Sequence, residues 1–321
     1  MKKLEKTTRN LGIDLLRIVA MFMIVYGHVI RFSFSSFSAT LSHDSSQYIW
    51  LTCLNYFCLV GVNIYAMISG YVMVNKEPSI SKLIPMWLQL VFISLAIAGF
   101  ARLFHCDITN KPLWKYALPI SQKCWWYMTA YFGMYPFLPF INHALRKMTK
   151  RELLTGGGFL IVFFSLIPTC SRNRNLFELE HGYSVVWLLV CYILGAIIFL
   201  LQNDLEFFLR RIHLGVWKIL LGTVVVILCM TIVCDVVQPV AFIRRMLLYT
   251  YDSYVSPLML IYATSMVLCF SKLVFSLCLG KIMLYVSSLT LPIYLFHTHP
   301  VVWTKMFVHP IMLQVEDIGL F

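Results

Sequence analysis

The feature of this chain that most limits its fold is a succession of long apolar segments from one end to the other. Each segment has roughly 18–25 residues, the length that an α-helix needs to cross the hydrocarbon core of a bilayer. Only 12% of the residues are charged, whereas a soluble domain has roughly 25%. The polar stretches between the segments are too short to bury a core of their own. The sequence therefore predicts an all-α, polytopic bundle of transmembrane helices.

Hydropathy divides the chain into about nine predicted spans. Each span must satisfy its own backbone hydrogen bonds in lipid, so helices are expected, and the alternating pattern of a membrane β-barrel is absent. The first span is expected to be retained, because Asp14 and Arg17 interrupt the apolar run that a signal peptide would need. The spans are placed at 11–31, 50–74, 83–104, 123–143, 153–170, 183–201, 214–236, 254–275 and 282–304.

Positive charge in the loops predicts a cytoplasmic N-terminus. In that orientation the inner loops hold more Lys and Arg than the outer loops, although the third loop is also basic. The net charge of +12 does not indicate nucleic-acid binding, because no basic helix with interleaved aromatic residues is present. Anionic lipid headgroups or a phosphorylated substrate are the expected partners of these cations.

The first span contains three ionisable side chains, Asp14, Arg17 and His28. Such groups are costly inside a membrane and mark functional positions. The spacing from Arg17 to His28 returns to within about 20° of the same helix face and separates them by roughly 16 Å along the axis. Asp14 lies one turn before Arg17 on this face. The three residues are expected to form one polar stripe that faces the bundle interior or a water-filled cavity.

Each residue of the stripe also has a structural interpretation. Asp14 can serve only to pair with Arg17, Arg17 can reach the inner headgroups, and His28 can be a satisfied structural histidine. A cation at one depth and a base at another also suit a reaction whose donor and acceptor come from opposite sides of the membrane.

A second histidine cluster lies near the outer end of the last predicted span. His297 and His299 point to different sides of a helix, and Pro300 disfavours helical geometry at His299, so His297 is expected to face inward. No metal is expected, because no third ligand stands at the spacing of a zinc motif.

Two pairs of arginines lie in predicted outer loops, Arg172 with Arg174 and Arg244 with Arg245. One interpretation is contact with water or lipid headgroups. The alternative is that these cations hold an anionic glycan or the phosphate of a lipid-linked acceptor.

Several motifs together carry a resemblance. The most specific is Asp14-x-Leu16-Arg17 followed by ten residues and His28. Weaker ones are Gly61-Val62 with Ser69-Gly70-Tyr71, Trp125-Trp126-Tyr127 with Tyr131, Tyr135 and Pro139, Gly182–Trp187 with Tyr192 and Gly195, Ser256-Pro257, and Tyr294–His297. Over roughly residues 10–300 this pattern resembles the family 3 membrane acyltransferases.

The resemblance implies a multi-pass enzyme of the bacterial plasma membrane. It would move an acyl group, expected to be acetyl, from cytosolic acyl-CoA to a hydroxyl of a cell-surface glycan or lipid-linked saccharide. Arg17 would bind the donor, acetyl-CoA, and Asp14 would fix Arg17. His28 would take the proton of the acceptor hydroxyl or carry the acyl group briefly, and His297 would assist it. Metals and nucleic acid have no part in this scheme.

Ser69 and Tyr294 are expected to support the site, but Ser69 has no adjacent base and is not a candidate nucleophile. Members of the family usually have ten helices, whereas residues 301–313 here include Lys305, His309 and Pro310. The chain is therefore expected to form one domain over residues 1–321 that lacks the final helix.

A different class of function remains open. A transporter or flippase of a lipid-linked sugar or small solute would share the many helices and the buried Arg and His, and inverted repeats would favour it. A polysaccharide polymerase is a third reading, which a large outer loop would favour.

Overall fold

The computed structural model describes residues 9–37, 46–104, 112–211, 214–236, 250 and 252–303. Within these ranges the chain consists of helices and loops without a strand, which confirms the predicted all-α class. Seven of the described helical segments are long and apolar enough to cross a membrane: Leu11–Arg31, Gln47–Met73, Ile80–Leu103, Lys150–Cys170, Val185–Leu209, Val216–Cys234 and Cys278–His297.

These segments match seven of the predicted spans, and the other two are helical but interrupted or short. The predicted span 123–143 is divided into α6 (Trp126–Met134), the 3-10 turn η2 (Tyr135–Phe137) and α7 (Leu138–Lys147). The cause is Pro136, which has no backbone N–H and whose ring displaces the preceding turn.

The predicted span 254–275 is a short helix, α13 (Pro257–Phe270). It begins late because Ser256 is its N-cap, where the hydroxyl accepts a hydrogen bond from the N–H of Leu258 at 3.2 Å. Pro257 then occupies the first helical position, where its missing N–H costs nothing.

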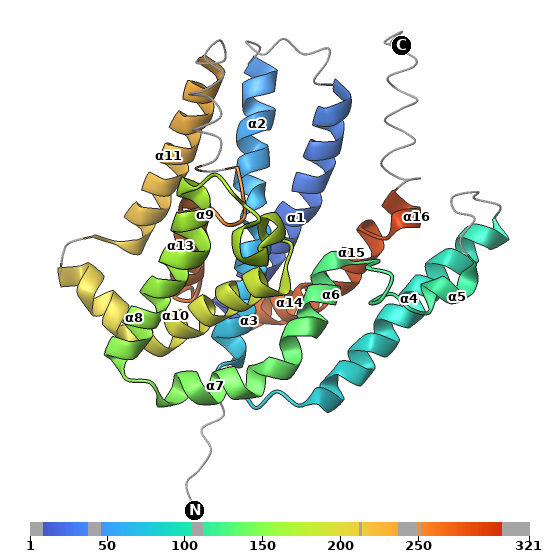
Figure 1. Cartoon of the computed structure of the whole chain (residues 1–321), viewed down its shortest axis with the longest axis horizontal. Helices are drawn as coiled ribbons and strands as arrows, with labels where there is room; N and C mark the ends of the chain where they lie inside the picture. Colours follow the sequence, from blue (N-terminus) through green and yellow to red (C-terminus); the bar gives the residue numbers. More distant parts are fainter. Residues whose placement is uncertain are drawn as a thin grey trace, which may run out of the picture.

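The centre of the molecule is the crossing of α3 (Gly61–Met73) and α10 (Val185–Arg211), which lie against each other in the middle of Figure 1. Two glycines allow the close approach. A Cβ on Gly70 would lie 1.8 Å from the carbonyl oxygen of Tyr192, and one on Gly195 would lie 2.0 Å from that of Met67. Small residues at such crossings let two helix backbones touch inside a membrane.

Around this crossing, α1 (Leu11–Phe37) contacts α2 (Ser46–Leu59), α3, α13, α14 (Leu277–Ser288) and α15 (Thr290–His297). The first helix therefore packs against the last long helices of the described chain. The remaining helices are η1 (Ile80–Lys82), α4 (Leu83–Leu103), α5 (Leu113–Tyr116), α8 (Lys150–Ile161), the π-turn η3 (Val162–Leu166), α9 (Ile167–Cys170), η4 (Leu176–Glu178), η5 (Glu180–Gly182), α11 (Val216–Val236) and α16 (Pro300–Val302).

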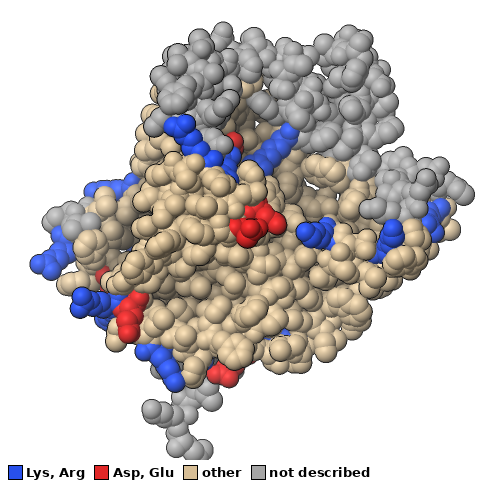
Figure 2. Space-filling view, in the orientation of Figure 1, with Lys and Arg blue, Asp and Glu red and all other residues tan. Residues whose placement is uncertain are grey.

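The described surface is strongly apolar. Phe92 and Phe100 of α4 are 73% and 63% exposed, and Phe140 of α7 is 76% exposed. In Figure 2 the charged side chains lie over the upper half and along the left and lower edges of the visible face, around a broad uncharged expanse. Apolar exposure on this scale suits lipid rather than water.

The cytoplasmic position of the N-terminus stays a prediction. Residues 304–321, where the sequence predicts that a tenth helix is missing, lie outside the described residues.

Candidate active site

One polar cluster lies near the start of α1 and is built around the carboxylate of Asp14, which is only 3% exposed. Arg9 donates two hydrogen bonds of 2.7 Å, one to each carboxylate oxygen. Arg17 and Ser287 also donate to Oδ1, at 3.2 and 3.1 Å. A buried carboxylate is tolerated when charge and hydrogen bonds compensate it in this way. Asp14 thereby fixes the position of the Arg17 guanidinium.

Arg17 is suited to bind an anion from this position. Its Nη1 also donates to Ser287 Oγ at 3.3 Å, and 25% of its side chain remains exposed. Lys76, three residues after the end of α3, lies in the same region, and burial together with the charges of Arg17 and Arg9 lowers its pKa. Arginine stays charged and presents a planar fork of donors, which matches phosphate and carbonyl groups.

A second cluster lies further along α1, where His28 contacts His297 of α15. His28 Nδ1 and His297 Nε2 are 3.1 Å apart, and His297 Nδ1 is 2.8 Å from the carbonyl oxygen of Ile293. A carbonyl oxygen only accepts, so His297 Nδ1 carries a proton and, in the neutral ring, His297 Nε2 accepts. His28 Nδ1 must then be the donor. In the neutral His28 ring, Nε2 therefore has no proton and carries the lone pair.

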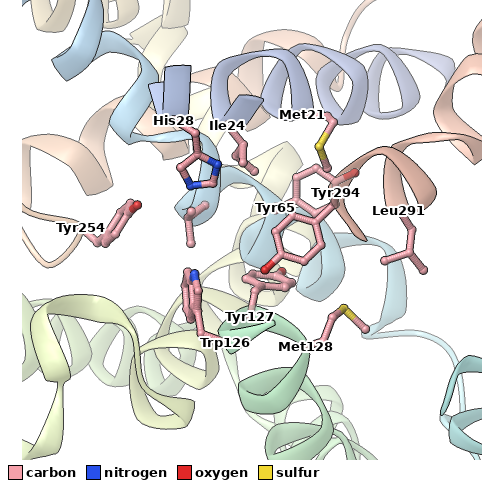
Figure 3. A pocket seen from close by; sticks show the side chains of 11 residues that line it. Met21, Ile24, His28, Tyr65, Trp126, Tyr127, Met128, Tyr254, Leu291 and Tyr294 are labelled. Carbon is pink, nitrogen blue, oxygen red and sulfur yellow. The ribbon is translucent and has the colours of Figure 1, made fainter. Parts of the chain in front are cut away.

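His28 faces a cleft with an empty volume of about 450 Å³. Figure 3 shows its ring pointing from α1 toward Trp126, with Tyr254 on one side and Tyr65 and Tyr294 on the other. The other walls are mainly apolar or aromatic and come from α1, α3, α6 and α15. We refer to this space as the histidine cleft. A base in a largely apolar cleft is shielded from water, which favours transfer to a bound acceptor over hydrolysis.

The histidine cleft adjoins two further cavities. A small one of about 270 Å³ shares His28, Val62 and Tyr254 with it. A larger one of about 600 Å³, here called the outer vestibule, shares Arg31 and Asn55 with the small cavity. Tyr254 lines all three spaces. The three spaces therefore adjoin one another through shared wall residues between Arg31 and His28.

The other candidate residues that the sequence predicts are Tyr294, Ser69, His297 and His299. Tyr294 lines the histidine cleft, and its ring lies edge-on to His297 with centroids 6.0 Å apart. Ser69 donates its hydroxyl to the carbonyl oxygen of Tyr65 at 3.1 Å, and it does not line any of the three cavities. His299 caps α16, where its Nδ1 accepts the N–H of Val301 at 3.3 Å. His297 rather than His299 therefore contacts His28, and neither of the two lines any of the three cavities.

The arginine pairs of the loops are only partly brought to the cavities. Arg174 lines the outer vestibule, whereas Arg172 is exposed and does not. Arg244 and Arg245 lie outside the described residues.

The sequence did not indicate a role for several residues that line the three cavities. Arg31 follows His28 by one helical turn and so continues the same stripe, a signal that the spacing offered. Tyr65 and Tyr254 carry no such signal, because an isolated aromatic residue in a membrane protein is usually an anchor or a packing group. Tyr127 belongs to the Trp125-Trp126-Tyr127 motif, which marks it only as part of the resemblance. No group of three or more metal-ligating side chains occurs among the residues that the structure describes.

Comparison with known protein families matches residues 10–321, nearly the whole chain, to the acyltransferase domain of family 3. No curated protein and no solved structure matches the chain significantly.

Proposed function

Because the chain belongs to the family 3 acyltransferases, we propose that it transfers an acetyl group from cytosolic acetyl-CoA to a hydroxyl group of a glycan or lipid-linked saccharide. The proposed location is the bacterial plasma membrane. The observation that carries the chemistry is the His28–His297 pair, which leaves Nε2 of His28 as a base at the wall of an apolar cleft.

The donor is proposed to enter at the Asp14–Arg17 end of α1. Arg9, Arg17 and Lys76 gather there, and the phosphates of CoA are anions that such donors bind. The distance along α1 from Arg17 to His28 is roughly 16 Å. The long, flexible pantetheine arm of CoA can carry the thioester over that distance into the histidine cleft.

In the transfer step, His28 Nε2 takes the proton of the acceptor hydroxyl while the hydroxyl oxygen attacks the thioester carbonyl. The carbon–sulfur bond then breaks, and the CoA thiolate receives the proton from His28. His297 holds the His28 ring through Nδ1 during both proton transfers, as the orienting member of a catalytic triad does. The balance is alcohol plus acetyl-CoA giving ester plus CoA.

A covalent route uses the same lone pair. His28 Nε2 attacks the thioester carbonyl first, and the carbon–sulfur bond breaks to release CoA as a thiolate. The acceptor hydroxyl then attacks the acetyl-histidine, its proton passes to the thiolate, and His28 Nε2 recovers its lone pair. Rapid quenching of a single turnover with labelled acetyl-CoA separates the two routes, because only the covalent route leaves label on the protein.

The first test is acetyl transfer by the full-length protein in nanodiscs, together with mass spectrometry of cell-surface glycans. His28→Ala is expected to lower the transfer rate about 10²–10⁴-fold, the usual effect of removing a general base. Glycans of cells that carry this variant should lose the mass of one acetyl group per modified repeat, as deletion cells do. His143→Ala is the matched control, because His143 is exposed on α7 and distant in sequence from the site.

The alternative gives a different pattern. If the glycans keep their acetylation but decrease in amount in the deletion strain, the protein moves or polymerises saccharides and is not the acetyltransferase. Unchanged transfer in well-folded His28→Ala protein would exclude His28 as the base.

A further inference from the structure

The outer vestibule is distinct from the parts of the site used so far. It lies at the Arg31 end of α1, about 14 residues, or roughly 21 Å, beyond Arg17. Most of its wall residues are polar or charged, and six of these carry the argument: Arg31, Asn55, Arg174, His181, Tyr183 and Asp252.

Two guanidinium groups in the outer vestibule face a single carboxylate. Arg31 Nε donates to Asn55 Oδ1 at 3.0 Å, which fixes the side chain without neutralising it. Arg174 Nη1 lies 3.8 Å from Asp252 Oδ2, with the Arg174 side chain only 17% exposed. Burial raises the pKa of Asp252, and the charges of Arg174 and Arg31 act against that rise. Positive charge therefore exceeds negative charge in this cavity.

Aromatic side chains also join the wall of the outer vestibule to the wall of the histidine cleft. Tyr183 stands edge-on to Tyr254 with ring centroids 5.2 Å apart, and to Trp126 with centroids 4.6 Å apart. Trp126 and Tyr254 both line the histidine cleft. An aromatic wall that connects the two spaces suits the apolar faces of a sugar ring.

The loop that lines the outer vestibule has a costly backbone. Between α9 and α10 the left-handed region, which side chains other than glycine rarely adopt, is occupied by Arg172, Phe177, Glu178, Glu180 and His181. Hydrogen bonds hold this conformation, including one from the N–H of His181 to the carbonyl oxygen of Arg174 at 3.1 Å. Strained backbone of this kind persists only where its surroundings fix it, and it clusters at ligand sites.

We propose that the outer vestibule binds an anionic group, a phosphate or a carboxylate, on the saccharide acceptor, so that the acceptor hydroxyl reaches His28. The inference rests on the proposed function for the identity of the acceptor. Arg31 and Arg174 supply the charge, and a guanidinium binds either anion through two parallel hydrogen bonds.

The test is a binding titration of the full-length protein in nanodiscs. Binding is measured by saturation-transfer NMR, with acetyl-CoA present to occupy the donor site. Three probes are compared: methyl glucuronide, glucose 1-phosphate and neutral methyl glucoside. At least one of the anionic probes is expected to bind about tenfold more tightly than the neutral one. The tighter of the two identifies the source of the charge as a uronic acid or a sugar phosphate.

Arg174→Gln is expected to remove this preference, whereas Arg172→Gln, which removes the same charge from an exposed position of the same loop, should retain it. Equal binding of neutral and anionic probes by the wild type, or equal effects of the two variants, would overturn the inference. Acetyl transfer is measured separately on the same samples. If anion binding depends on Arg174 but no acetyl transfer is detected, the proposed function is contradicted and the anion site is still supported.

Discussion

At the scale of single residues, the proton on each nitrogen of His28 and His297 determines what the pair can do. The carbonyl of Ile293 assigns the proton on His297 Nδ1, and His297 Nε2 then assigns the proton on His28 Nδ1. A histidine without such a neighbour exchanges between its two neutral forms, and only one of them presents a base to the histidine cleft. We therefore propose that His297 positions His28.

Replacing His297 tests this assignment. His297→Ala is expected to lower kcat for acetyl transfer about 10²-fold or more with little change in the KM of acetyl-CoA, because orientation of the base is lost. His297→Gln, which can still accept a hydrogen bond, should lose less activity. The direct measurement is the ¹⁵N chemical shift of labelled His28, expected to show an unprotonated Nε2 in the wild type and a mixture in His297→Ala. A wild type that already shows a mixture would exclude the assignment.

Asp14 gives a second prediction at this scale. Asp14→Asn leaves Arg9 and Arg17 beside a neutral group, and removing one member of a charged hydrogen-bonded set costs about 2 kcal/mol. The variant is expected to unfold at a lower temperature in detergent and to have a raised KM for acetyl-CoA, because Arg17 is no longer held. Glu152→Gln is a suitable control, since Glu152 forms only a helix cap with Thr149 at the surface. Unchanged KM in Asp14→Asn would separate Asp14 from donor binding.

Spacing along α1 was sufficient to predict the stripe of Asp14, Arg17 and His28, and the ion pair between Asp14 and Arg17 is present. The hydrogen bonds to Ser287 and His297 could not be predicted in the same way. They join α1 to residues about 270 positions later in the chain, and periodicity within one helix contains no information on its neighbours. The catalytic roles of these residues stay predictions.

At the scale of helices, the structure depends most on the crossing of α3 and α10. The glycines at this crossing stand where backbone meets backbone, so an added methyl group has no side chain to displace. Asn63 reinforces the same crossing from within. It accepts the indole N–H of Trp187 at 2.9 Å and donates to the carbonyl oxygen of Tyr254 at 2.8 Å. The crossing and the position of Tyr254 are therefore linked through one buried amide.

Gly70→Ala and Gly195→Ala are each expected to destabilise the protein by about 1–3 kcal/mol or more, because overpacking forces the two helices apart. Gly99→Ala is the matched control, since a Cβ at Gly99 meets nothing within 4 Å. It should leave the unfolding temperature equal or higher, because alanine favours a helix over glycine. The unfolding temperatures of the variants are compared in detergent, and the variants are first checked for equal expression. A control that fell as far as Gly70→Ala would show that the loss of stability does not come from close packing at the crossing.

Apolar length predicted where most helices lie, but not how they end or break. The span predicted to end at 201 continues to Arg211. The helix α10 therefore includes the polar residues Gln202, Asn203 and Asp204, which follow the apolar run. The break at Pro136 and the late start of α13 depend on single residues that a hydropathy average does not resolve. Helix existence is therefore more predictable than helix continuity.

At the scale of the whole molecule, the three connected cavities and the Asp14 cluster lie along one helix. Arg17 is near its beginning, His28 lies in its middle part and Arg31 follows one turn later. A single rigid helix fixes the spacing between a proposed donor end and a proposed acceptor end. This arrangement suits a reaction across a membrane better than two sites on separate mobile elements would.

The contacts of α1 with α14 and α15 also have a consequence for the time course of synthesis. Asp14 and His28 are made among the first residues, but their partners Ser287 and His297 are made near the end. A chain still attached to the ribosome therefore holds His28 without His297, and it holds Asp14 and Arg17 without Ser287. Under the proposed function, acetyl transfer would begin only when the last described helices insert beside the first.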